Sequence, residues 1–88
     1  MPEYRITFAR SAGREMERLS ADVAARVLSR IEALAQNPRP PGCRKVIGFE
    51  GLWRIRSGDY RVIYQVLEDE HVVDVVAVRH RSDAYRLR

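Results

Sequence analysis

Cysteine and histidine are scarce in this sequence, which has one cysteine, Cys43, and two histidines among 88 residues. One cysteine cannot form an internal disulfide, so the chain suits a reducing compartment. Without a CxxC pair a metal site is not expected either. No apolar run approaches the roughly 18 residues of a membrane-spanning helix, and the sequence opens without an apolar secretory segment. We therefore expect a cytoplasmic protein with no membrane partner and no metal site.

Lysine is almost absent as well, with Lys45 standing alone beside fifteen arginines. The formal net charge is +4 and the pI about 9.8, which together suggest an anionic partner. Arginine binds phosphate better than lysine does, because its planar guanidinium offers parallel N–H donors. GC-rich coding sequence would also raise the arginine content. The positions of the arginines are therefore more informative than their number.

The first half of the chain predicts a strand followed by two helices. Residues 3–8 alternate polar and apolar side chains, as a strand does. Apolar side chains then recur every three or four residues, and Ser20 is a favourable N-cap for a second helix over residues 21–36. The short break between the helices predicts an antiparallel helical hairpin. Three prolines within residues 37–42 end the second helix and predict a stiff, extended loop.

The second half of the chain predicts β-structure. The expected elements are a short strand at 44–47, a turn at 48–51, and strands at 52–57, 60–67 and 72–80. The last strand is apolar on both faces, so it should be central in the sheet. An apolar content of 45% and a charged content of 32% suit one globular domain over residues 1–88. The predicted fold class is α+β, with a two-helix hairpin packed on one face of a mainly antiparallel sheet of four or five strands, in the order β-α-α-β-β-β-β.

Three arginines are expected side by side on the hairpin formed by residues 52–67. Gly58 and Asp59 signal a two-residue turn, which places Arg56 opposite Arg61. Opposed residues share a face, and so do residues two apart, so Arg54 joins them on one surface. Opposed like charges destabilise a pair by about a few tenths of a kcal/mol. The arginines therefore either splay into water over the sheet or form a cationic surface for phosphate.

The last predicted strand ends in three further polar residues, Arg79, His80 and Arg81. This strand should lie beside residues 60–67, and Arg79 and Arg81 share a face because they are two residues apart. Whether that is the face of Arg61 depends on whether the connecting loop holds an even or odd number of residues. The sequence leaves both arrangements open.

Several short motifs follow one another in the second half of the sequence. They are Asn-Pro at 37–38, Lys-Val-Ile-Gly at 45–48, Trp-Arg-Ile-Arg at 53–56, Gly-Asp-Tyr-Arg-Val-Ile-Tyr at 58–64, His-Arg at 80–81 and Tyr-Arg at 85–86. Each motif alone is a weak signature, but their combination is specific. Together with the two predicted helices, it resembles the RelE branch of the RelE/ParE toxin superfamily over nearly the whole chain.

The resemblance implies a toxin of a type II toxin–antitoxin system that enters the ribosomal A site and cuts mRNA there. Its partners would be a cognate antitoxin, the ribosome and mRNA, with no metal and no small-molecule cofactor. In this family a ribose 2′-hydroxyl attacks the adjacent phosphate and leaves a cyclic phosphate. Fixed guanidinium groups would stabilise the negative charge that builds on that phosphate.

The resemblance also implies roles for individual residues. The implied catalytic residues are Arg54, Arg56, Arg61, Arg81 and Tyr85. The implied RNA-binding residues are Arg44, Lys45, Arg79 and His80. Members of this branch often have lysine where this chain has Arg54 and Arg56, and arginine stays protonated near neutral pH. The general base would then be Tyr85, if nearby cations lower its pKa, or His80, since histidine as a residue type is suited to accept a proton near neutral pH.

Two other functions fit the sequence. A ParE-like toxin shares the fold and acts on DNA gyrase without cutting RNA, although such proteins generally lack a cationic face combined with a terminal tyrosine. A non-catalytic nucleic-acid-binding module, or a toxin homologue that has lost its activity, would also carry a basic surface.

Overall fold

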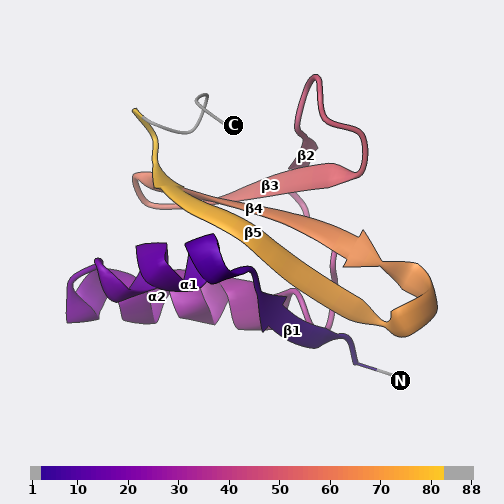
Figure 1. Ribbon diagram of the computed structural model, residues 1–88, viewed down its shortest axis with the longest axis horizontal. Helices are drawn as coiled ribbons and strands as arrows, with labels where there is room; N and C mark the ends of the chain where they lie inside the picture. Colours follow the sequence, from indigo (N-terminus) through magenta and orange to yellow (C-terminus); the bar gives the residue numbers. More distant parts are fainter. Residues whose placement is uncertain (1–2, 83–88) are drawn as a thin grey trace.

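A five-stranded sheet forms the centre of the computed structural model, which describes residues 3–82 (Figure 1). Its strands are β1 (Arg5–Phe8), β2 (Arg44–Lys45), β3 (Leu52–Ser57), β4 (Tyr60–Leu67) and β5 (Val72–His80). Their spatial order is β1-β5-β4-β3-β2. β1 runs parallel to β5, and the other neighbouring strands are antiparallel. The last strand, predicted to be central, is an interior strand: β5 lies between β1 and β4, and β4 is in the middle of the sheet.

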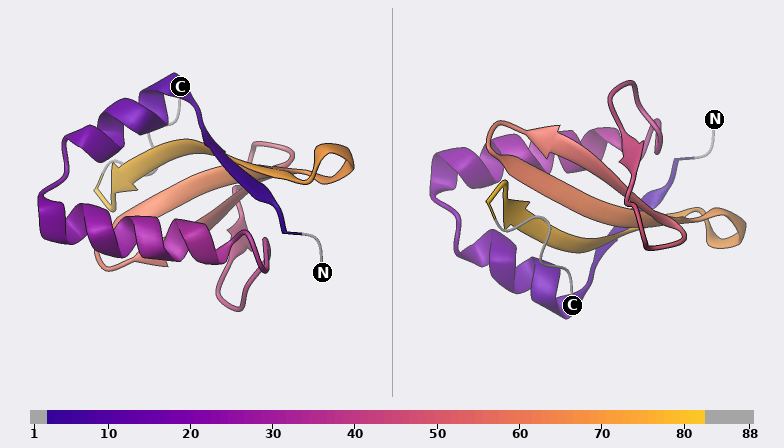
Figure 2. Two further views of the ribbon diagram at one scale, coloured as in Figure 1. Left: turned by 90° about the horizontal axis from the view of Figure 1, so that it is seen from below. Right: turned by 90° about the horizontal axis from the view of Figure 1, so that it is seen from above.

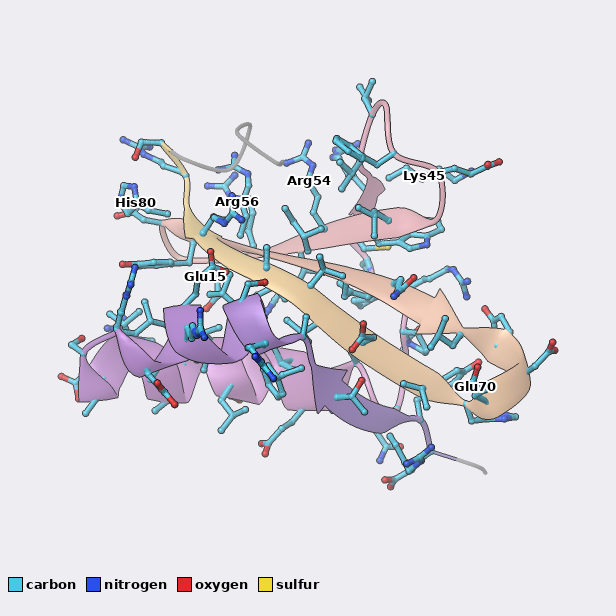
Figure 3. All side chains as sticks on the ribbon, in the orientation of Figure 1. Glu15, Lys45, Arg54, Arg56, Glu70 and His80 are labelled. Carbon is cyan, nitrogen blue, oxygen red and sulfur yellow. The ribbon has the colours of Figure 1, made fainter. Side chains whose placement is uncertain are left out.

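Helices α1 (Arg10–Glu17) and α2 (Ala21–Ala33) both lie against the same face of this sheet (Figure 2). The predicted α+β fold and element order are thereby confirmed. Ser20 caps α2, since its side-chain oxygen accepts a hydrogen bond from the N–H of Val23. Within the described residues, the opposite face carries side chains such as Arg54 and Arg56 but no helix (Figure 3). No helix in this part of the chain is long and apolar enough to cross a bilayer.

Two elements end earlier than the sequence predicted. The second helix was expected to reach residue 36, but α2 ends at Ala33. Residues 34–36 form turns instead, in which each N–H bonds to the carbonyl three positions back. The strand expected over 44–47 stops at Lys45. The N–H of Val46 bonds to the carbonyl of Leu52, and Gly48 has a φ of 88°, so the chain is already turning there.

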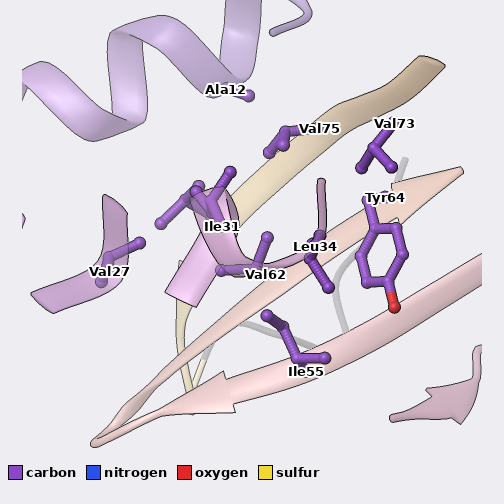
Figure 4. Packing of buried hydrophobic residues seen from close by; sticks show 10 residues of the cluster. Ala12, Val27, Ile31, Leu34, Ile55, Val62, Tyr64, Val73 and Val75 are labelled. Carbon is purple, nitrogen blue, oxygen red and sulfur yellow. The ribbon is translucent and has the colours of Figure 1, made fainter. Parts of the chain in front are cut away.

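The hydrophobic core lies between the helices and the sheet (Figure 4). The helices contribute Ala12, Val27 and Ile31, and Leu34 follows directly after α2. The sheet contributes Ile55, Val62, Tyr64, Val73, Val75 and Val78. Each of these side chains is at most 3% exposed. Burial of a large aliphatic side chain stabilises a fold by about 1.5–3 kcal/mol, so this cluster is the main source of stability.

Tyr64 links this core to the proline-rich loop. Its ring is fully buried, and its hydroxyl donates a 2.6 Å hydrogen bond to the carbonyl of Pro38. Arg39 in the same loop pairs with Glu68, and its guanidinium lies 5.1 Å from the centre of the Trp53 ring. These contacts hold the loop against the sheet before the chain enters β2.

Replacing Tyr64 with phenylalanine should test this link. The substitution keeps the buried ring but removes the donor to the Pro38 carbonyl. The bond is part-buried, and a typical intramolecular hydrogen bond contributes about 0.5–1.5 kcal/mol net, so we expect the free energy of unfolding to fall by that amount. Urea denaturation at pH 7 measures the difference. An unchanged unfolding midpoint would show that the hydroxyl does not anchor the loop.

The same pair of proteins should differ in their response to alkaline pH. Burial raises the pKa of Tyr64 above its ordinary value, so the folded state favours the neutral phenol. This contribution to stability is fully present below about pH 10, where tyrosine in the unfolded chain ionises, and is lost as the pH rises further. The stability difference between the wild type and Tyr64→Phe should therefore shrink above pH 10. A difference that stays constant up to pH 11 would contradict this.

Candidate nucleic-acid interface

Three arginines from three neighbouring strands form a row across the sheet. Arg56 of β3 lies opposite Arg61 of β4, and Arg61 lies opposite Arg79 of β5. Opposed residues share a face, and the row points away from the helices, as Figure 3 shows for Arg56. Neighbouring strands lie about 4.8 Å apart, so the row spans about 10 Å. The predicted pairing of Arg56 with Arg61 is confirmed.

A second row of residues extends the same surface. Arg44 of β2 pairs with Arg54 of β3, and the row continues through Ile63 and Ala77. Arg54 lies two residues from Arg56, so both rows share one face. Ile63 and Ala77 are each 1% exposed, which makes the floor beside the arginines apolar. We call this set of side chains the arginine face; it comprises Arg44, Arg54, Arg56, Arg61 and Arg79.

A β-bulge in β5 brings Arg79 onto the arginine face. The even-length loop between β4 and β5 would by itself pair Arg61 with Val78. Val76 is an extra residue in β5, and the register shifts by one at this point, so Arg61 pairs with Arg79 instead. Val75 and Val78 consequently both point into the core, although they are three residues apart. This single inserted residue is the reason why Arg79 lies on the same face of the sheet as Arg61, which the sequence did not determine.

Helix α1 holds the outer edge of β5 at the bulge and beyond it. β1 pairs only with the first half of β5, so a different partner has to cover the rest of that edge. There Ser11 donates a 3.3 Å hydrogen bond to the carbonyl of Val76, and Glu15 accepts one of 2.8 Å from the N–H of Val78. The other carboxylate oxygen of Glu15 accepts a 2.6 Å hydrogen bond from Nε of Arg79. This role could not be predicted from the sequence, because nothing distinguishes Glu15 from the other charged residues of the same helix.

Two residues with implied RNA-binding roles lie on the helix side of the sheet. Lys45 is opposite Trp53, with Nζ 5.7 Å from the ring centre. His80 is opposite Tyr60, and the two rings meet edge to face with their centres 5.4 Å apart. Nδ1 of His80 is also 3.0 Å from the hydroxyl of Ser82. The structure therefore brings neither Lys45 nor His80 to the arginine face.

The two remaining implied catalytic residues follow β5. Arg81 is exposed, and its N–H bonds to the carbonyl of Asp59, so it lies beside the turn between β3 and β4. Tyr85 lies outside the described residues. The resemblance favoured Arg81 as the late catalytic arginine, whereas the strand register places Arg79 directly beside Arg61.

The arginine face is suited to binding a polyanion. Opposed guanidinium groups repel one another, although Glu15 pairs with Arg79 at one end of the row. An incoming phosphate would relieve that repulsion while accepting hydrogen bonds from the arginines. The nearest strand carboxylate on this face, Asp74, is occupied by Thr7 and Gln65, which donate hydrogen bonds of 2.7 and 3.1 Å. In the part of the chain that the structure describes, no three His, Cys, Asp or Glu side chains gather in a way that could hold a metal ion.

Comparison with known families gives a match over most of the chain. The family model described as the ParE toxin of the type II toxin–antitoxin system parDE matches residues 6–85. The toxin RelE of Mycobacterium tuberculosis is 32% identical over 85 residues, which cover 96% of this chain and 88% of that protein. The mRNA interferase toxin RelE of Escherichia coli K12 is 28% identical over 92 residues, which cover 93% and 90% of the two chains.

A solved structure shares the whole fold. In the crystal structure of the toxin–antitoxin complex RelBE2 from Mycobacterium tuberculosis, one chain matches this one with a TM-score of 0.80. The sequence identity is 26%, and the match covers 94% of this chain and 97% of that one. The sequence comparisons and the structure comparison therefore agree, since all of them match toxins of toxin–antitoxin systems.

Proposed function

This chain belongs to the RelE/ParE family of type II toxin–antitoxin toxins, and from that premise we propose that it is a ribosome-dependent endoribonuclease that cuts mRNA in the A site. The observation that carries the proposal is the row of Arg56, Arg61 and Arg79 on the helix-free face of the sheet. A relative at 28% identity is an mRNA interferase, which supports the same activity here. Action on translating ribosomes would take place in the cytoplasm.

The proposed reaction needs two things from the protein, a general base and stabilisation of the charge that develops on the phosphate. The 2′-oxygen of a ribose bonds to the adjacent phosphorus while its proton passes to a general base. The bond from phosphorus to the 5′-oxygen of the next nucleotide breaks, that oxygen takes up a proton, and a 2′,3′-cyclic phosphate remains. Negative charge builds on the phosphate oxygens in the transition state. Guanidinium groups fixed on a rigid sheet stabilise that charge, because they need no rearrangement as it develops. In this role Arg61 acts from the centre of the row, with Arg56 and Arg79 on either side.

The other arginines extend the interface along the mRNA. Arg44 and Arg54 lie in the row beside Arg56 and would bind neighbouring phosphates. Arg81, exposed beside the hairpin turn, would contact the RNA at the rim of the face. Arginine cannot serve as the general base near neutral pH, so that role is assigned to Tyr85. His80 is the weaker candidate because it lies on the helix side of the sheet.

A ParE-like action on DNA gyrase is the second candidate function. It is favoured by one finding, the match to the ParE toxin model over residues 6–85. Such a toxin would not need a row of phosphate-binding arginines on an open sheet. The arginine face therefore favours the nuclease.

Induced expression in cells separates these functions. The nuclease should stop translation and leave mRNA cut at A-site codons, which mapping of mRNA 5′ ends on translating ribosomes would detect. DNA damage with intact mRNA would instead indicate the gyrase inhibitor. If neither effect appears at a verified expression level, the chain is an inactive nucleic-acid-binding homologue and the proposal is wrong.

A cognate antitoxin is the expected protein partner. Solved relatives of this chain are toxin–antitoxin complexes. Burying several arginines without counter-charges is costly, so the antitoxin should place acidic residues against the arginine face, using an amphipathic helix or an added strand. Co-expression with the small protein encoded beside this chain should raise the soluble yield and abolish toxicity. If no such protein co-purifies, the toxin–antitoxin assignment of this copy is contradicted.

A further inference from the structure

Glu15 is the point at which helix α1 contacts the arginine face. Its two carboxylate oxygens accept hydrogen bonds from adjacent residues of β5, the N–H of Val78 at 2.8 Å and Nε of Arg79 at 2.6 Å. The side chains of Arg79 and Glu15 are only 23% and 22% exposed. Figure 3 shows Glu15 directed from α1 toward β5. The Glu15 carboxylate therefore connects helix α1 both to the backbone of β5 and to the side chain of Arg79, a candidate phosphate-binding residue.

This contact differs from an ordinary surface ion pair. Exposed pairs contribute little, because two long side chains must be held in one geometry and water screens the charges. Here the backbone N–H of Val78 holds the carboxylate in place, so Arg79 meets a partner whose position is already fixed. A guanidinium group is planar, and a hydrogen bond at Nε therefore sets the direction of its two terminal nitrogens.

The contact also lies just after the bulge that decides the facing of Arg79. A bulge bends and twists its strand, and a shift of one residue turns every following side chain to the other face. Ser11 bonds to the extra residue, Val76, and Glu15 bonds two residues further on. Among the described residues, β5 has no neighbouring strand on its outer edge beyond Val75, and helix α1 takes that place by bonding to Val76 and Val78.

We propose that Glu15 is a positioning residue that orients the guanidinium of Arg79 on the arginine face, an inference that rests on the proposed nuclease function. Glu15 acts through Arg79 and not on the RNA. Removing the Glu15 carboxylate should therefore slow the cleavage step clearly, while the affinity for the ribosome and the free energy of unfolding change little. Helix α1 is then a part of the catalytic framework as well as of the core.

Substitutions at Glu15 test this assignment. Glu15→Ala should lower the single-turnover rate of mRNA cleavage on programmed ribosomes by roughly 10–100-fold, the cost of a misplaced group, with little change in ribosome affinity. Glu15→Gln should lower the cleavage rate by a similar factor but disturb stability less, because its single amide oxygen can still accept from Val78 while its amide nitrogen is a donor and cannot accept from the Nε–H of Arg79. Glu17→Gln is the matched control, since Glu17 is exposed on the same helix and the charge change is identical. It should cut at the wild-type rate.

A double-mutant cycle separates positioning from general stabilisation. In an Arg79→Ala background, Glu15→Ala should have no further effect on cleavage, because the side chain that it orients is absent. If Glu15→Ala lowers cleavage by the same factor in both backgrounds, Glu15 does not act through Arg79. The proposal would then be overturned.

Side-chain NMR provides a readout that does not depend on cleavage. The Nε–H of Arg79 should exchange slowly with water in the wild type and in Glu17→Gln, and rapidly in Glu15→Ala. Exchange that is unaffected by Glu15→Ala would overturn the positioning role, whatever the cleavage data show. If the wild type cuts no mRNA but this protection is seen and is lost in Glu15→Ala, the nuclease proposal fails while the orientation of Arg79 by Glu15 stands.

Discussion

Replacing Arg61 with alanine should lower the rate of mRNA cleavage by roughly 10²–10³-fold, the usual cost of removing one fixed donor to a developing anion. Arg61 is the centre of the row, directly opposite both Arg56 and Arg79. The substitution removes a phosphate donor and a like-charge neighbour together. Stability should therefore stay the same or rise slightly, while toxicity is lost. Arg56→Ala, at the exposed end of the row, should act in the same direction.

Single-turnover cleavage on programmed ribosomes and thermal unfolding measure the two quantities separately. Arg30→Ala is a matched control, because it removes the same charge from the exposed surface of α2, on the other side of the sheet. This control should cut at the wild-type rate. If Arg61→Ala lowers stability by more than about 2 kcal/mol, the arginine has a structural role and the assignment of the row to phosphate binding is wrong.

The hairpin that carries Arg54, Arg56 and Arg61 could be predicted, because the sequence features that determine it are close together in the chain. The strands expected at 52–57, 60–67 and 72–80 coincide with β3, β4 and β5. The two-residue turn at Gly58 and Asp59 fixes the pairing across the hairpin, and Gly58 has the positive φ, 59°, that such a turn requires. Turn chemistry and the alternation of apolar side chains thus determine the shared face of Arg54, Arg56 and Arg61.

The facing of Arg79 could not be predicted, because the last strand lacks the pattern that would fix its register. Residues 72–78 are apolar on both faces except at Asp74, so a shift of one residue leaves an apolar side chain against the core in either case. Nothing in this run marks Val76 as the extra residue. The bulge is defined by the pairing of β5 with β4, and the contacts at the bulge and just after it are with α1, which lies 63 to 65 positions away in the sequence. Contacts between residues so far apart in the sequence do not change the spacing of apolar residues along the strand, so the sequence pattern does not reveal them.

The general base is expected to be Tyr85, and Tyr85→Phe should lower the single-turnover cleavage rate by roughly 10²–10⁴-fold, as loss of a general acid–base group does. A phenol has a pKa of about 10, so a tyrosine general base would need cations beside it, such as those of the arginine face, to lower that pKa. Phenylalanine keeps the aromatic ring, so any stacking on an RNA base should persist and ribosome binding should change little.

His80→Ala is the informative comparison, because His80 alternates with Arg79 and so lies on the opposite side of β5, against Tyr60. Its ring cannot reach a phosphate bound by the arginine row without a change in the strand. We therefore expect His80→Ala to reduce cleavage far less than Tyr85→Phe does, when both are measured on the same programmed ribosomes. A fully active Tyr85→Phe together with an inactive His80→Ala would show that the base is His80. The substrate would then have to bind at the end of β5, and not across the face of the sheet.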